Sequence, residues 1–200
     1  MAVSRSEVHE KLIELFKDTV GLTDEELDHM LAQFTPLALK RKSFYLQPGD
    51  VCKQITYVNK GCTRTYYPTE DGKEHTLYFA VENWWIGDIE SFHSGEPTKY
   101  FVQALEDTQL LVMPKSGYDK MAREIPKYND WYQMKVRKAY MASIKRYTDF
   151  KSGSAEERYR NLMKSQPYVL QRVASKYIAD YLEIEPESLS RLRRKIFSKE

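Results

Sequence analysis

The sequence contains little cysteine and little histidine. Two thiols, Cys52 and Cys62, are too few to ligate an iron–sulfur cluster or to build a four-thiolate zinc site. The histidines stand singly, without metal-ligand spacing, at His9, His29, His75 and His93. The sequence therefore indicates no metal or cofactor. We expect both cysteines to be reduced thiols in or near a buried core.

Long apolar runs are also missing. No segment approaches the roughly 18 consecutive apolar residues that span a bilayer. The N-terminal residues MAVSRSEVHEKL lack the apolar core of a signal peptide. These absences predict a cytoplasmic protein with no membrane partner. The hydrophobic content of 42% is nevertheless enough to bury a core in one large or two small domains.

The net charge of +2 is small but unevenly distributed. Residues 151–200 hold 11 Lys and Arg against 7 Asp and Glu, whereas residues 1–150 hold 20 against 22. The last quarter of the chain is therefore basic and the rest slightly acidic. A basic segment of this kind is typical of nucleic-acid binding, which does not require the whole protein to be basic.

Residues 7–34 have the apolar spacing of helices, interrupted at Gly21. Thr23 followed by Glu26 has the spacing of a capping box, which predicts that a second helix begins there. We expect both helices to be packing elements.

Short strand-like runs follow, from about residue 37 to residue 114. The connector PTEDGKE, between runs at 55–67 and 75–86, predicts a β-hairpin. The segment YFVQALEDTQLLVM at 100–113 predicts another, with its corner at EDT. Several short strands without intervening helices indicate an antiparallel barrel or jelly roll, and such barrels often enclose ligand pockets.

Residues 126–150 form one long predicted helix, because the sequence continues to Gly153 without glycine or an interior proline. Its apolar side chains form two stripes. One consists of Met134, Met141 and Ile144, and the other of Val136, Tyr140, Tyr147 and Phe150. A helix that is apolar on two sides covers the barrel and a second partner, for which the same helix of another subunit is the favoured candidate. Burial within one subunit is the alternative.

The short flexible segment KSGS at 151–154 predicts a hinge. Beyond a further helix at 155–167, residues 175–194 have the apolar spacing of a helix-turn-helix. Ile178, Ala179 and Leu182 are on the inner face of its first helix, and Leu189 and Leu192 on that of its second. Glu183 occupies the corner position at which glycine commonly accepts a positive φ.

The outward face of the second helix carries groups suited to base edges and phosphates. These predicted DNA-binding residues are Glu187, Ser188, Ser190, Arg191, Arg194 and Lys195. An arginine can offer two parallel donors to guanine, and a glutamate can accept from the amino group of cytosine. The alternative interpretation of PESLSRLRRK is a solvated, charged helical face.

This order of parts resembles the Crp/Fnr superfamily of bacterial transcription regulators. The most specific segments are IADYLEIEPESLSRLRRKI, the EERY segment after the hinge, and IGDIESF. The resemblance implies an α+β fold with an N-terminal antiparallel β-roll or jelly roll and flanking helices, a long dimerisation helix and a C-terminal all-α helix-turn-helix domain. It places a cyclic-nucleotide-binding-like sensor domain at 1–150 and the DNA-binding domain at 151–200.

The resemblance also implies partners. It predicts a homodimer joined through the long helix, with Met134, Met141 and Ile144 as the first candidate seam, that binds palindromic double-stranded DNA and contacts RNA polymerase. Glu187 and Arg191 match the glutamate and arginine with which the family's recognition helix reads bases.

The effector loop departs from the family pattern. Gly87 and Asp88 match the Gly-Glu that begins the phosphate-binding loop of nucleotide-binding members, with a shorter carboxylate. Thr98, Lys99 and Tyr100 stand where that loop has its arginine. Because lysine does not replace a bidentate arginine, we predict that cyclic AMP is not bound in the usual manner. The pocket is then either filled by its own aromatic side chains, with Trp84, Trp85, Phe92 and Tyr100 as candidates, or open to a more apolar effector, and the effector is unidentified.

Three hypotheses follow from the sequence. The first is a dimeric DNA-binding transcription regulator, which is not an enzyme. The second is an interaction module with a ligand-free β-roll and a vestigial helix-turn-helix, which would select no DNA site. The third is a cupin-type metalloenzyme, which needs clustered histidines that the sequence lacks.

Overall fold

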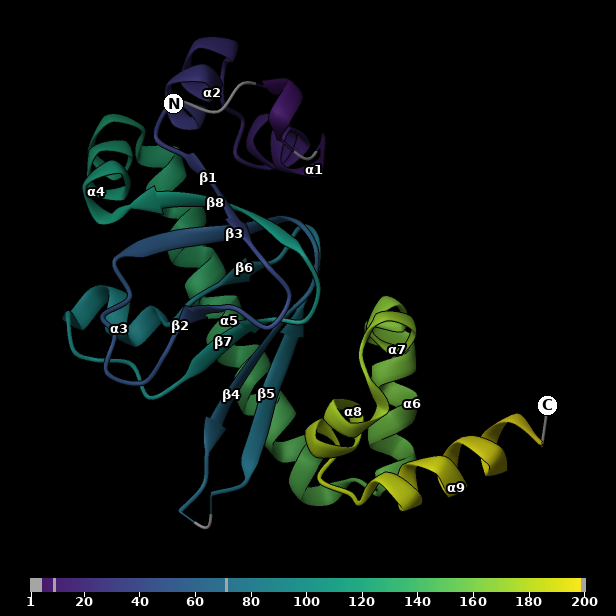
Figure 1. Cartoon of the computed structure of the whole chain (residues 1–200). Helices are drawn as coiled ribbons and strands as arrows, with labels where there is room; N and C mark the ends of the chain where they lie inside the picture. Colours follow the sequence, from purple (N-terminus) through teal and green to yellow (C-terminus); the bar gives the residue numbers. More distant parts are fainter. Residues whose placement is uncertain (1–4, 9, 71, 199–200) are drawn as a thin grey trace.

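The computed structural model describes residues 5–8, 10–70 and 72–198. The chain begins with a small helical layer at one end of the molecule (Figure 1). It comprises η1 (Arg5–Glu7), α1 (Glu10–Glu14), the π-helical turn η2 (Leu15–Thr19) and α2 (Asp24–Leu31). The predicted capping box is confirmed, since the Thr23 hydroxyl accepts from the Glu26 amide and the Glu26 carboxylate accepts from the Thr23 amide.

The centre of the fold is an antiparallel β-roll of two four-stranded sheets. One sheet has the order β1-β8-β3-β6, built from Thr35–Leu39, Thr108–Pro114, Gln54–Lys60 and Trp85–Ile86. The other has the order β2-β7-β4-β5, built from Phe44–Leu46, Phe101–Ala104, Thr63–Pro68 and Glu74–Ala80. The predicted jelly-roll architecture is therefore confirmed, and both cysteines are free and buried in it.

One predicted hairpin is confirmed and the other is wrong. The segment PTEDGKE joins β4 to β5, which pair antiparallel. The strands on either side of EDT, β7 and β8, do not pair, because β7 bonds to β2 and β4 while β8 bonds to β1 and β3. The corner from Leu105 to Asp107 carries the chain from one sheet to the other, which two adjacent apolar runs do not reveal.

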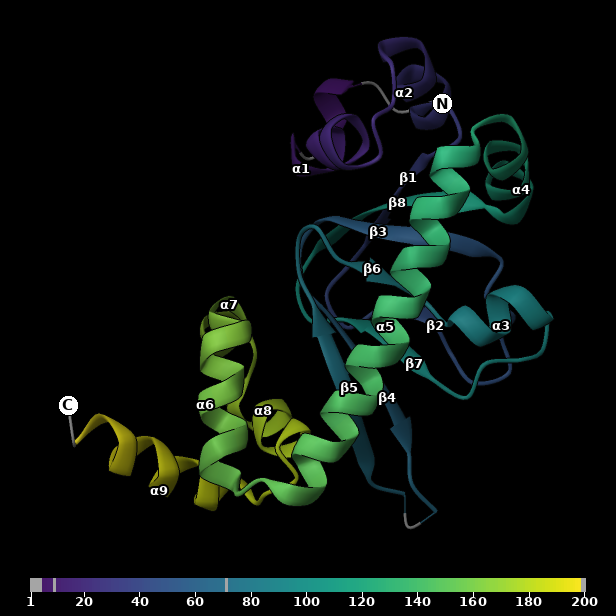
Figure 2. The ribbon, with the colours of Figure 1, turned by 180° about the vertical axis from the view of Figure 1, so that it is seen from behind.

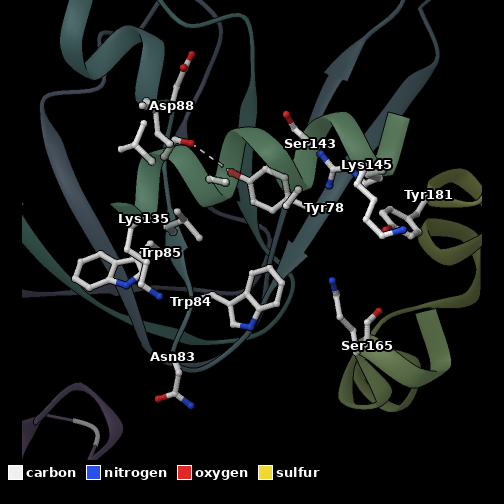
Figure 3. Close-up of a pocket in the computed structure, with 18 of the residues that line it drawn as sticks. Tyr78, Asn83, Trp84, Trp85, Asp88, Lys135, Ser143, Lys145, Ser165 and Tyr181 are labelled. Carbon is white, nitrogen blue, oxygen red and sulfur yellow. Dashed lines mark hydrogen bonds between the residues drawn. The ribbon is translucent and has the colours of Figure 1, made fainter. Parts of the chain in front are cut away.

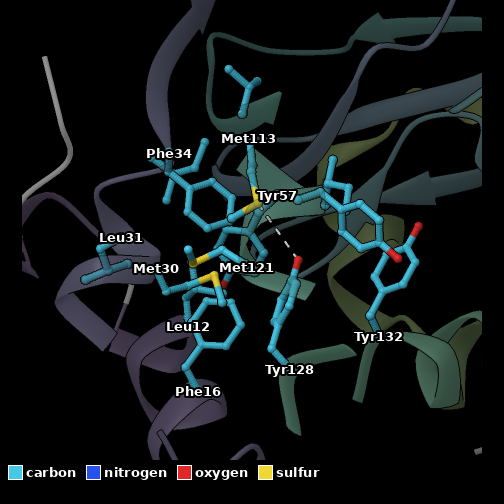
Figure 4. Close-up of a cluster of buried hydrophobic side chains, with 14 of the residues drawn as sticks. Leu12, Phe16, Met30, Leu31, Phe34, Tyr57, Met113, Met121, Tyr128 and Tyr132 are labelled. Carbon is cyan, nitrogen blue, oxygen red and sulfur yellow. Dashed lines mark hydrogen bonds between the residues drawn. The ribbon is translucent and has the colours of Figure 1, made fainter. Parts of the chain in front are cut away.

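Three helices flank the roll. The short helix α3 (Ile89–Ser94) follows β6, α4 (Lys115–Glu124) follows β8, and α5 (Pro126–Ser152) runs along the roll and beyond it (Figure 2). The predicted long helix is thus confirmed, whereas α4 was not predicted. The first turns of α5, with Tyr128 and Trp131, close the main core together with side chains from the N-terminal layer, such as Leu12 and Phe16 (Figure 4).

The C-terminal part is entirely helical. It contains α6 (Ala155–Ser165), α7 (Pro167–Arg172), α8 (Ser175–Tyr181) and α9 (Pro186–Phe197). The break between α5 and α6 at Gly153 and Ser154 lies in the predicted hinge segment, and Ser154 caps α6 through a second capping box. At the corner between α8 and α9, Glu183 has φ +53°, so this position does require the left-handed conformation that the sequence indicated.

The C-terminal helices pack against the β-roll. Their apolar core, which includes Tyr159, Leu162 and Ile178, is continuous with Cys62 and Phe79 of the roll. The Phe79 ring is 5.5 Å from the Tyr181 ring. In the part of the chain that the structure describes, no helix is both long and apolar enough to cross a membrane.

Candidate DNA-reading helix and effector cavity

The helix α9 forms where the sequence predicts the second helix of the motif. Pro186 is at its first position, where a missing amide donor is tolerated. Leu189 and Ile196 are buried against α8 and α6, and Ile184 fills the corner as a half-buried residue. This inner face fixes which side chains of α9 face the solvent.

The outward face of α9 carries the six residues predicted to bind DNA. Five of them are exposed, namely Glu187, Ser190, Arg191, Arg194 and Lys195, and Ser188 is half-buried. The Arg191 guanidinium donates to the Ser188 hydroxyl at 2.9 Å. The Lys195 ammonium lies 2.8 Å from the Glu156 carboxylate of α6. An exposed arginine and glutamate one helical turn apart have the chemistry that reads a base pair in the major groove.

The side chains that hold this helix in place were not predicted from the sequence. Arg193 points inward and donates to the Tyr159 hydroxyl at 3.2 Å and the Ser175 hydroxyl at 2.9 Å. Arg158 donates to the Leu182 carbonyl oxygen at 2.8 and 3.1 Å and to that of Gly153 at 2.9 Å, so it joins the hinge to the corner of the motif. The only signal in the sequence is that Arg193 lies off the outward face of α9 and that Arg158 lies outside this helix.

The residues predicted for the effector loop lie together around the start of α3. Gly87 has φ +125°, and a Cβ there would lie 3.2 Å from the Cys52 sulfur. The Asp88 carboxylate caps α3 by accepting from the Glu90 and Ser91 amides at 3.0 and 3.2 Å. Its second oxygen accepts from the Thr98 hydroxyl at 2.7 Å. Both oxygens of the carboxylate are therefore engaged within the loop.

The other end of the loop supplies no cation to the space beside Asp88. Thr98 is buried and its backbone bonds to Gly49 and Asp50, and Lys99 is exposed. Tyr100 is half-buried, with its ring against Tyr67. Neither Lys99 nor Tyr100 lines the neighbouring cavity, whereas Gly87 and Asp88 do.

That cavity, of about 1010 Å³, lies between the β-roll, α5 and α6. Figure 3 shows Tyr78 and Trp84 on the side of the roll, Lys145 on α5 and Ser165 on α6. The Tyr78 hydroxyl donates to the Gly87 carbonyl oxygen at 3.3 Å. We expected Trp84, Trp85, Phe92 and Tyr100 to be the aromatic side chains that fill the effector pocket. Trp85 packs on Trp131 and Tyr57, and Phe92 is buried, but Trp84 is 38% exposed and leaves the cavity open.

The charged groups of the cavity wall are mostly cationic: Lys135, Lys145, Arg146, Arg158 and Lys164, against Asp88 and Asp149. Burial lowers the pKa of Lys135, and nearby Lys138 lowers it further. Arg146 donates to the Leu77 carbonyl oxygen at 2.7 Å and lies over the Tyr78 ring. The indole nitrogen of Trp131 is buried and has no partner among the described residues. An aromatic wall with cations at its edge suits a ligand that is apolar in part and anionic in part.

The outer side of α5 carries an exposed apolar stripe. Tyr140, Met141, Ile144 and Tyr147 are all exposed there, at the spacing of one helix face. Met134 differs from this expectation, because it is half-buried and packs against the core of the roll together with Val136. The exposed stripe thus combines members of both predicted stripes, since the β-roll covers only the first part of the helix.

No three His, Cys, Asp or Glu side chains among residues 5–8, 10–70 and 72–198 are grouped as a metal site requires.

Residues 36–124 match the family model described as the cyclic nucleotide-binding domain. Among curated proteins, none matches the sequence.

Solved structures match over nearly the whole chain. The c-di-GMP-responsive global regulator CLP of Xanthomonas campestris is 13% identical with a TM-score of 0.69, over 88% of this chain and 93% of that one. A Crp/Fnr-family transcriptional regulator of Eubacterium rectale is 16% identical with a TM-score of 0.69, over 95% and 89%. The catabolite activator protein of Thermus thermophilus is 21% identical with a TM-score of 0.56, over 92% and 87%. Residues 36–124 are therefore similar to the cyclic nucleotide-binding domain family, and the chain as a whole has the fold seen in the Crp/Fnr transcription regulators.

Proposed function

We propose that the protein is a transcription regulator that binds palindromic double-stranded DNA as a homodimer. The observation that carries this proposal is the outward face of α9, where Glu187 and Arg191 are exposed one turn apart on a helix held by Arg193 and Arg158. We divide the chain into a sensor part, residues 1–150, and a DNA-binding part, residues 151–200. The net basic charge of the second part supports this division.

The exposed stripe of α5 supports the homodimer. Four large apolar side chains on one face of a solvent-exposed helix are a typical interaction surface, and a second copy of the same helix presents a matching one. A dimer would place two copies of α9 for two half-sites about 34 Å apart on the duplex. The resemblance also makes RNA polymerase a proposed partner of the DNA-bound dimer.

The effector, if one is used, is proposed not to be cyclic AMP held by the family's phosphate loop. Asp88 is engaged by the α3 amides and by Thr98, and Lys99 is turned to the solvent, so the loop offers neither the free carboxylate nor the guanidinium fork. Isothermal titration of the purified protein with cyclic AMP tests this. We expect no heat of binding at micromolar concentrations, and saturable binding there would contradict the proposal.

Selection of binding sites from random duplex DNA tests the proposed function itself. The purified full-length protein should enrich a palindrome whose half-sites are one helical turn apart. Enrichment of no sequence over the starting pool would refute specific DNA recognition and favour an interaction module instead.

A further inference from the structure

The face of α5 that lines the cavity has small side chains between two cationic ones. Lys135, Ala139, Ala142 and Arg146 are three or four residues apart, so they follow one face of the helix. All four line the cavity between the β-roll, α5 and α6. Ala139 and Ala142 leave the space that larger side chains would fill. This face of α5 therefore offers room for a ligand between two positive charges.

The roll contributes large apolar side chains to the same cavity. Trp84 is 38% exposed and Ile89 is 45% exposed, and both line it. In Figure 3 the Trp84 indole lies between Trp85 and Ser165 among the side chains that surround the cavity. The Trp85 ring packs on that of Trp131, with the centroids 5.7 Å apart. Accessible aromatic rings of this kind favour a ligand that carries a ring of its own, which can contact them stacked or edge to face.

The Lys135 ammonium lies at the edge of this aromatic wall, 5.8 Å from the centroid of the Trp131 ring. Among residues 5–8, 10–70 and 72–198, no carboxylate forms an ion pair with it. Partial burial lowers the pKa of Lys135, and the positive charge of Lys138 lowers it further. A bound anion would stabilise the charged form of Lys135 and oppose both effects. Lys135 is therefore the cation that is best suited to hold the anionic group of a ligand.

The other cations of the wall are less suited to this role. Lys145 pairs with Asp149 at 2.9 Å, and Arg146 donates to a backbone carbonyl oxygen of β5 at 2.7 Å. Arg158 donates to carbonyl oxygens of the hinge and of the α8–α9 corner. Lys164 is exposed on α6, across the cavity from α5. A phosphate group binds where several cations or backbone amides converge, whereas one free lysine matches one carboxylate.

We propose that the cavity binds an aryl carboxylate, with its carboxylate on Lys135 and its aromatic ring over Ala139 and Ala142 against Trp84. This site differs from the phosphate-binding loop of the nucleotide-binding regulators, because α5 rather than the segment from Gly87 to Tyr100 holds the anion. The proposal goes beyond the proposed function and does not depend on it, since the ligand is bound without DNA.

Isothermal titration of the full-length protein with three small compounds tests this site. Phenylbutyrate has the ring and the carboxylate, phenylbutyramide replaces the carboxylate by a neutral amide, and octanoate replaces the ring by an aliphatic chain. We expect phenylbutyrate to bind about tenfold more tightly than phenylbutyramide. It should bind about threefold more tightly than octanoate. Because Trp84, Trp85 and Trp131 all line the cavity, binding should also shift the tryptophan emission.

Two variants and a control locate the ligand. Lys135→Gln should bind phenylbutyrate and phenylbutyramide equally, because the carboxylate loses its partner. The control Arg123→Gln removes the same charge at an exposed position on α4, outside the cavity wall, and should keep the tenfold preference. Ala139→Phe fills the space one turn from Lys135 and should weaken both compounds about tenfold. Ala139 is exposed, so the larger side chain does not disturb the core.

Equal affinity of the wild type for phenylbutyrate and phenylbutyramide would overturn the recognition of a carboxylate, and so would a preference that survives in Lys135→Gln. Undiminished binding to Ala139→Phe would place the ligand elsewhere and overturn the site. Octanoate that binds as tightly as phenylbutyrate would overturn the aromatic part of the proposal. If none of the three compounds gives heat or an emission shift, the proposal fails as a whole. A failed selection from random DNA refutes the proposed function alone and leaves this result unchanged.

Discussion

Arg172 and Glu82 meet through two parallel hydrogen bonds, with guanidinium nitrogens 2.6 and 3.0 Å from the two carboxylate oxygens. Partial burial by itself raises the pKa of Glu82. The Arg172 guanidinium and the Gly61 amide outweigh burial and lower this pKa from 4.5 to about 2. A forked arginine–carboxylate pair has a fixed geometry, so it orients α7 on the roll as well as attracting it.

This pKa shift makes the stability of the protein depend on pH in the acidic range. A carboxyl group whose folded-state pKa is lowered contributes stability that is complete above its unfolded pKa, near 4.5, and is lost as the pH falls towards 2. Urea denaturation at pH 5.5 and pH 3 should show a smaller loss of unfolding free energy in Glu82→Gln than in the wild type. Equal losses in both proteins would show that the Glu82 pair does not contribute.

Gly61 is predicted to be intolerant of a side chain. Its φ is +114°, and a Cβ would lie 2.7 Å from the Cα of Thr108. Gly61→Ala should therefore destabilise the protein by about 2–4 kcal/mol in chemical denaturation. Gly49→Ala is the matched control, because Gly49 also has a positive φ, +95°, but nothing lies within 4 Å of the added carbon. Its expected cost is about 1 kcal/mol. Equal costs would contradict the close approach at Gly61.

Arg64 should contribute to stability through its two aromatic neighbours. Arg64→Met keeps the length of the side chain but loses the cation between Tyr66 and Tyr177 and the 2.5 Å ion pair to Glu74. We expect a loss of about 2 kcal/mol in unfolding free energy. Arg64→Lys should retain only part of it, because a point charge does not stack as a planar guanidinium does. Arg123→Met, at an exposed position on α4, should change little. A similar small effect at Arg64 would refute the role of the stack.

The exposed stripe of α5 should set the oligomeric state. Replacing Met141 and Ile144 by glutamate places charge in the proposed seam, so sedimentation velocity should show a monomer where the wild type is a dimer. Arg123→Glu changes the net charge by the same amount at an exposed position on α4, away from the stripe, and this variant should remain dimeric. A wild-type monomer, or a dimer that persists with both glutamates, would contradict the proposed seam.

The elements with strong local signals were predictable from the sequence. Apolar periodicity located α5, α8 and α9, and the capping residue Thr23 located α2. The Asp-Gly turn located the β4–β5 hairpin. The corner at EDT was misread because sheet membership is decided by pairing partners far away in the sequence, such as β1 and β3 for β8. The helices α3 and α7, of 6 residues each, were missed because too few turns are present for a period to emerge, and α4 was missed as well.

The site was predictable only where a single helix defines it. Once the buried residues of α9 are identified from their spacing, the exposed residues on its opposite face follow, so they could be named. The role of Asp88 could not be predicted, because its carboxylate accepts a hydrogen bond from Thr98 at 2.7 Å only once the chain has folded. The ion pairs of Arg172 were equally hidden, since Arg172 is separated by 66 residues from Glu106 and by 90 from Glu82. Met134 was assigned to the seam because periodicity does not show where the β-roll ends along α5.

The central claim is that α9 reads DNA through Arg191, and one titration tests it most directly. Fluorescence anisotropy should compare the wild type, Arg191→Ala and the control Arg123→Ala, each with the selected duplex and with a duplex changed at one base pair of the half-site. We expect wild type and control to discriminate the two duplexes by about 1–3 kcal/mol, and Arg191→Ala to lose that preference at one position while retaining salt-dependent binding. An Arg191→Ala protein that discriminates the duplexes as the wild type does would contradict the account.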